Sequence, residues 1–183
     1  MTADVLPIVD TSVTTNKKIL ISELVAAMGP QGTLNTTTGG TSIAFTGIPA
    51  WATEITLSWV GLSASGVSQW LLRLGDAGGL ENSGYEANAG LRSGEIGSTV
   101  GFPLFGAAPV AASVYSGSIT IILQDAATFM WVVKGGSNAP VSGVPSMLQG
   151  YKALSAALTQ ISLTTTNGTD TFDVNGGVNI RYR

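Results

Sequence analysis

The chain has 183 residues with no cysteine and no histidine, and only 10% of its residues are charged. This length suits one domain with a sizeable core. The composition excludes disulfides, thiol nucleophiles, Cys/His zinc sites and catalytic triads that use imidazole as their base. The eight basic and eleven acidic residues are scattered singly and give a net charge of −3, so no basic patch for nucleic-acid binding is expected.

The low charge has a second consequence, for self-association. Charged residues usually make up about 25% of a globular domain. With so few, exposed sheet edges repel one another weakly, and we expect a homo-oligomer that buries them. No apolar run approaches the roughly 18 residues that span a bilayer, and residues 1–20 lack the pattern of a signal peptide. We therefore expect no membrane insertion.

Residues 1–30 differ in character from the rest and are predicted to form an N-terminal arm. Pro7 favours an extended start, and after a polar turn Ser22 can cap a short helix over Glu23–Met28 that Gly29 ends. Two turns of helix are unstable alone, so the arm must pack on its own domain or on a partner subunit. The candidate attachment residues are Leu6, Pro7, Ile8, Val9, Ile19, Leu20 and Leu24.

Residues 31–40 are polar and rich in turn formers, and we interpret them as a linker into a domain spanning residues 41–183. The first part of that domain, Thr41–Gly75, carries three short apolar runs between Gly, Pro and Ser turns. In the middle run Ile55, Leu57 and Trp59 alternate with polar residues, and this period of two predicts a strand with one buried face.

The glycine-rich stretch 75–101 predicts long loops with weak strands near 83–91 and 96–102, and residues 102–114 predict a loop with apolar anchors. The four tryptophans are interpreted as core or rim packing.

Regular alternation returns at 116–124 and 128–134, which predict a hairpin, and further strands are expected at 144–153, 158–165 and 178–182. The pair Asn167–Gly168 predicts a type I′ hairpin turn. Many short strands between turn residues favour an all-β fold, an antiparallel β-sandwich of jelly-roll-like type.

Carboxylates provide the remaining candidates for chemistry. Asp76, Glu81 and Glu86 lie in a glycine-rich loop, where they are interpreted as solvated residues rather than a calcium site or a glycosidase acid–base pair. Asp170 and Asp173 are interpreted as turn caps. No catalytic residue, metal or cofactor is predicted, and the chain is not expected to be an enzyme.

Both ends of the chain nevertheless resemble a known class of proteins. The segment Leu6–Ser12, followed by Lys17–Ile19 and the predicted helix, resembles the N-terminal segment of tailed-bacteriophage structural proteins. The blocks Thr41–Pro49 and Leu74–Tyr85, and the closing Leu163–Ile180, are similar to the C-terminal β-domain of phage tail fibres. The resemblance is carried by turns and strand pattern.

The resemblance implies a non-enzymatic virion protein, assembled in the host cytoplasm as a homotrimer that binds other virion proteins. As a tail-fibre or receptor-binding appendage it would contact a host surface glycan or protein through loops 76–95 and 135–145. The alternative is a capsid decoration (cement) protein that clips capsomers through its N-terminal arm. The candidate residues of an exposed tip are Trp70, Asp76, Glu81, Tyr85 and Asn138.

Overall fold

A computed structural model describes residues 39–91, 94–111, 113–138, 145–173 and 176–183, together with the backbone of strands at 5–8, 17–20 and 34–36. All regular structure in this part of the chain is β-strand, and the two main sheets are antiparallel. The predicted antiparallel β-sandwich is therefore confirmed. The predicted helix Glu23–Met28 lies outside the described residues, as do Val9 and Leu24.

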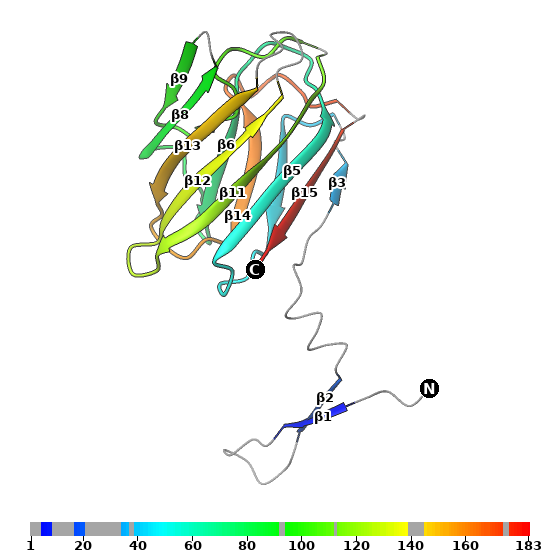
Figure 1. Ribbon diagram of the computed structural model, residues 1–183, viewed down its shortest axis with the longest axis vertical. Coiled ribbons are helices and arrows are strands. Elements are labelled where there is room, and N and C mark those ends of the chain that lie inside the picture. Colours follow the sequence, from blue (N-terminus) through cyan, green and yellow to red (C-terminus); the bar gives the residue numbers. More distant parts are fainter. Residues whose placement is uncertain are drawn as a thin grey trace.

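The larger sheet has eight strands, and their order does not follow the sequence (Figure 1). Its strands, from one edge to the other, are β3 (Leu34–Thr36), β15 (Gly177–Tyr182), β5 (Glu54–Leu62), β11 (Tyr115–Asp125), β12 (Met130–Ser137), β13 (Ser146–Ala153), β8 (Tyr85–Leu91) and β9 (Gly94–Ser98).

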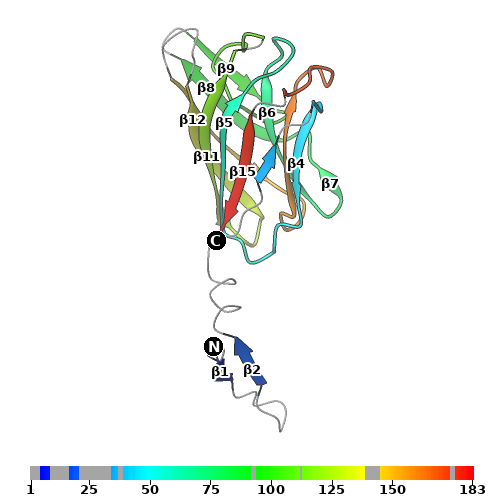
Figure 2. The ribbon, with the colours of Figure 1, turned by 90° about the vertical axis from the view of Figure 1, so that its right-hand side faces the viewer.

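The smaller sheet covers the inner face of the larger one, and the two layers are seen edge-on in Figure 2. Its order is β10 (Phe102–Pro103), β6 (Trp70–Asp76), β14 (Gln160–Thr165) and β4 (Ser42–Thr46), and β7 (Gly79–Leu80) also pairs with β6.

The N-terminal strands β1 (Val5–Ile8) and β2 (Lys17–Leu20) pair antiparallel in a two-stranded sheet of their own. Among the candidate attachment residues, Leu6, Pro7 and Ile8 belong to β1, and Ile19 and Leu20 belong to β2. Part of the predicted linker is strand β3, which pairs with β15 at the edge of the larger sheet.

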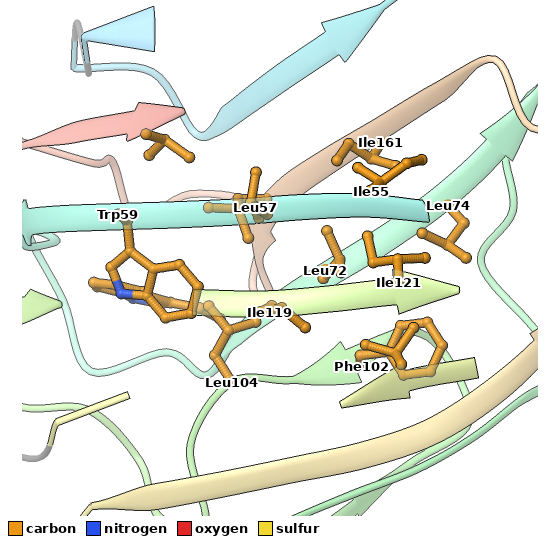
Figure 3. Packing of buried hydrophobic residues seen from close by; sticks show 14 of the residues in the cluster. Ile55, Leu57, Trp59, Leu72, Leu74, Phe102, Leu104, Ile119, Ile121 and Ile161 are labelled. Atoms are coloured by element: carbon orange, nitrogen blue, oxygen red, sulfur yellow. The ribbon is translucent and has the colours of Figure 1, made fainter. Parts of the chain in front are cut away.

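The core lies between the two layers and follows the predicted alternation (Figure 3). Ile55, Leu57 and Trp59 of β5 are at most 1% exposed. They face aliphatic side chains of the smaller sheet, including Leu72 and Leu74 of β6 (Figure 3). Fully burying one such side chain contributes about 1.5–3 kcal/mol, so this interface is the main source of stability.

Three of the four tryptophans pack in the core, as the sequence predicted. Trp59, Trp70 and Trp131 are at most 3% exposed, whereas Trp51 is 52% exposed and contacts the Tyr182 ring edge-on at 5.6 Å. Trp70 makes edge-to-face contacts with the rings of Phe105, Tyr115 and Phe172 at 5.0–5.3 Å.

The predicted type I′ hairpin at Asn167–Gly168 is wrong. The strands before and after it belong to different sheets, since β14 pairs with β4 and β6 while β15 pairs with β5 and β3. A type I′ turn needs a positive φ at both central residues, but of Asn167 and Gly168 only Gly168 has one, of 67°. The Asn167 side-chain oxygen accepts hydrogen bonds from the amides of Thr169 and Asp170, so this segment is an Asn-capped turn.

In the part of the chain that the structure describes, no helix has the length and hydropathy needed to cross a bilayer.

Candidate functional site: a groove on the outer face of the larger sheet

The residues predicted to form one exposed tip lie at opposite ends of the sandwich. Trp70 and Asp76 are the first and last residues of the same strand, β6. Asn138 follows β12 near the end that holds Trp70, and it is exposed, with its side-chain oxygen accepting a 2.6 Å hydrogen bond from the Ser116 amide. One tip cannot contain all of them.

Three of these residues are also buried, which corrects their predicted exposure. Trp70, Tyr85 and Asp76 are 0%, 1% and 6% exposed. Trp70 and Tyr85 alternate inward on strands that cover the core, and this period outweighs the glycine-rich context that suggested a loop. None of these three side chains is available to a partner molecule.

Asp76 and Glu81 instead belong to a polar network that joins both sheets. The Ser155 hydroxyl donates to Asp76 Oδ2 at 2.6 Å and lies 2.9 Å from Glu81 Oε1, while the other Glu81 oxygen pairs with the Lys152 ammonium. Lys152 is nearly buried, and its Nζ lies 5.6 Å from the centre of the Tyr85 ring.

This network favours the ionised form of both carboxyls. The Ser155 hydroxyl and the Gly78 amide lower the pKa of Asp76. Burial alone would raise the pKa of Glu81, but hydrogen bonds from Lys152 and Ser155 outweigh it, and the pKa is lowered. A glycosidase needs one carboxyl with a raised pKa as its general acid, and neither residue is prepared for that role.

The remaining acidic candidates do not converge. Glu86 follows Tyr85 in β8 and faces the outer side of the sheet, away from the buried network. Asp170 Oδ2 accepts a 3.0 Å hydrogen bond from the amide of Ser68, which is 102 residues away, so this carboxylate joins two loops rather than capping its own turn. No group of three or more acidic side chains in the described ranges is placed to hold a metal ion.

A large hollow lies on the outer face of the larger sheet, over β12, β13, β8 and β9. It is a shallow, open groove of about 1120 Å³. These strands lie side by side at one end of the sheet (Figure 1). The outward positions of each strand supply the groove's side chains, because inward positions fill the core.

Strand register sets two rows of side chains across this groove. One row is Val132, Tyr151 and Glu86, which are consecutive cross-strand partners on β12, β13 and β8. The next row is Lys134, Gln149, Asn88 and Gly97, on the same strands and β9. An aromatic ring with aliphatic surface therefore lies beside a row of amides and one ammonium group.

The groove's tyrosine is held by its cross-strand neighbour. Tyr151 is 40% exposed, and a hydrogen bond with the Glu86 carboxylate raises the pKa of its hydroxyl. The position of the Asn88 side chain depends on its own cross-strand neighbour, Gly97. Asn88 Oδ1 lies over Gly97, where a Cβ atom would come within 2.9 Å of it.

None of these groove residues except the carboxylate Glu86 was singled out from the sequence. The side chains are mostly uncharged and come from strands that are far apart in the sequence, such as β8 and β13, so only the strand pairing brings them together. The available signal was the alternation of Met147, Gln149 and Tyr151 on the exposed face of β13.

Comparisons with known proteins assign this chain to no family. No protein-family model matches this chain, and no curated protein matches it. Among solved structures, it is similar to the A. japonicus protein CB05 (TM-score 0.40, 16% identity, covering 98% of this chain and 31% of that one). It is also similar to an A. japonicus fructosyltransferase (TM-score 0.36, 15% identity, covering 92% and 29%).

A weaker similarity is to the VP2 subviral particle of infectious bursal disease virus (TM-score 0.13, 11% identity, covering 99% and 46%). The chain spans about a third to a half of the length of these matched structures. All three similarities are too low to support a statement about function.

Proposed function

We propose that this chain is a non-enzymatic structural protein of a tailed-bacteriophage particle, displayed as a tail-fibre or receptor-binding type of appendage. The resemblance of its two ends to phage structural proteins supports the virion assignment. The outer-face groove is the observation that supports a binding role, because it is a concave surface lined by outward side chains that the core does not require.

The structure of the edges supports the proposed homotrimer. Strands β4 and β9 end their sheets, and Glu95 is the one charged residue that they contain. Natural proteins protect exposed edges with charges, bulges or coverage, and association between copies supplies coverage. Sedimentation equilibrium of the purified chain tests this point, and a mass equal to three chains is expected.

Antibody labelling of intact particles tests the position of the protein. Gold label on tails or baseplates, together with inhibition of adsorption by the purified sandwich, is the expected result. An absence of label anywhere on purified particles would contradict the virion assignment. Label restricted to heads would instead favour the second candidate.

That second candidate is a capsid decoration protein. It is favoured by the separate pairing of β1 with β2, which form no ladder with either sheet of the sandwich and are thus available as a clip. Deleting residues 2–28 should then abolish binding to expanded capsids while the sandwich stays folded. Unchanged capsid binding by the truncated chain would exclude the clip.

A further inference from the structure

We propose that the outer-face groove binds a neutral oligosaccharide, with the Tyr151 ring as its stacking surface and the Asn88 and Gln149 amides as its polar contacts. This inference deepens the proposed receptor-binding role by naming the ligand class and the residues. It depends on that role for its biological meaning, but its chemistry can be tested on the purified protein alone.

The charge of the groove excludes strongly charged ligands. Among its lining residues only Glu86 and Lys134 are charged, and they carry opposite signs. A polyanion such as nucleic acid needs several cationic contacts, and a polycation needs several carboxylates. A neutral ligand rich in hydrogen-bonding groups matches this balanced lining.

The Tyr151 ring supplies an apolar surface that the sheet places in the groove. Glu86 is its direct cross-strand partner on one side, so strand pairing sets the position of the ring before a ligand covers it. Val132 flanks it on the other side. The C–H face of a pyranose ring is apolar and flat, and it packs well on such an aromatic surface.

The adjacent row supplies groups that can both donate and accept hydrogen bonds. Each of the Asn88 and Gln149 amides offers one acceptor and two donor hydrogens, and sugar hydroxyls also act in both ways. The two residues are direct cross-strand partners. Gly97 leaves open the space that the Asn88 carboxamide occupies, so this polar contact is placed by the fold.

The groove's size and openness favour a chain of several sugars over a small molecule. Pockets that enclose a drug-sized ligand hold about 300–1000 Å³. This groove has about 1120 Å³, and it is open to solvent along the sheet rather than closed around a ligand. An oligosaccharide can lie across it with both ends continuing into solvent.

Binding of the purified full-length chain to an array of bacterial surface glycans, with neutral and acidic members, tests this proposal. Affinities for the best neutral glycan are then measured by saturation-transfer NMR titration. Tyr151→Ala is expected to weaken binding about tenfold, and Gly97→Ala about threefold because it displaces the Asn88 amide. Gly97 has no positive φ, and its Cβ would be tight only against the movable end of the Asn88 side chain, with the Ala87 carbonyl at an ordinary 3.8 Å, so that variant should fold normally.

Met147→Ala is the matched control. Met147 lies on the same face of β13 as Tyr151 and is 72% exposed, but it does not line the groove. The glycan affinity of the Met147→Ala variant should therefore stay within about twofold of that of the unsubstituted protein. Binding to no neutral glycan, binding to acidic glycans alone, or equal affinities for all three variants would overturn the proposal. A change in sedimentation mass on Tyr151→Ala would overturn it too, by showing that another copy covers the groove.

These results are distinguishable from a failure of the proposed function. A protein that binds a neutral glycan through Tyr151 but is absent from particles keeps the groove assignment and loses the virion assignment. A protein that is found on tails by antibody labelling but binds no glycan keeps the virion assignment and loses the groove assignment.

Discussion

Substituting Glu81 by glutamine should destabilise the sandwich, because it leaves the nearly buried Lys152 ammonium without a charged partner. Removing one member of a fully buried pair costs about 3–5 kcal/mol. The Lys152 side chain is 7% exposed but that of Glu81 is 22% exposed, so solvent screening reduces the expected cost to about 2 kcal/mol. The glutamine Oε1 can still accept from Ser155, so the change isolates the charge.

Urea unfolding at fixed protein concentration measures this effect. With a slope of about 2 kcal/mol per molar urea, the midpoint should fall by about 1 M. Glu54→Gln is the matched control, because it removes the same charge from a pair whose cation is exposed: the Arg183 side chain is 72% exposed and that of Glu54 is 28% exposed. The control should cost about 0.5 kcal/mol or less. Adding Lys152→Met to Glu81→Gln should recover about 1 kcal/mol, since it removes the uncompensated ammonium.

Equal midpoint shifts for Glu81→Gln and Glu54→Gln would refute the reasoning, because burial would then make no difference to the pair. A double variant less stable than Glu81→Gln alone would refute the second step. In that case the hydrogen bond from Lys152 to the Ala153 carbonyl, or its contact with the Tyr85 ring, would outweigh the cost of the buried charge.

Three further predictions concern stability. Tyr85→Phe should cost about 1–3 kcal/mol in urea unfolding, because it leaves the buried Leu74 amide without its 2.9 Å acceptor. Trp70→Ala should cost about 3–5 kcal/mol in the same assay, since it opens a cavity among three aromatic rings. The lowered pKa values of Asp76 and Glu81 contribute stability above their ordinary values of 3.8 and 4.5, and it is lost as pH falls through the lowered values. The urea midpoint should thus decline below about pH 5, and a midpoint independent of pH between about 3 and 6 would contradict this.

The fold could be predicted wherever apolar residues alternate. Strands β5 and β11 keep their predicted alternation because burial of every second side chain leaves no other register. The prediction ended β12 too early, at Lys134, because Gly135 and Gly136 suggested a loop. In the structure they are paired strand residues, and a Cβ at Gly135 would lie 2.7 Å from Ile119 Cα, so glycine permits the close approach of β11.

The site could not be predicted in the same way, because its chemistry is shared among strands that only the sheet order makes neighbours. Asn88 and Gln149 are ordinary surface residues in the sequence and become a pair through the contact of β8 with β13. The glycine-rich context of Asp76 and Tyr85 suggested an exposed loop. Their burial instead follows from contacts with Ser155 and Leu74, which no local pattern indicates.

The alternation of side chains along strand β13 links the buried network to the outer groove, because successive residues point to opposite faces of the sheet. Lys152 points inward to Glu81, and the preceding residue, Tyr151, points outward beside Glu86. A slip of one residue between β13 and β8 would exchange these faces, placing the ammonium in the groove and the tyrosine ring in the core. The Glu81–Lys152 pair therefore favours the register that places the groove's aromatic surface, together with the other inward residues of β13. Its loss should weaken the proposed glycan binding along with stability, although Glu81 does not line the groove.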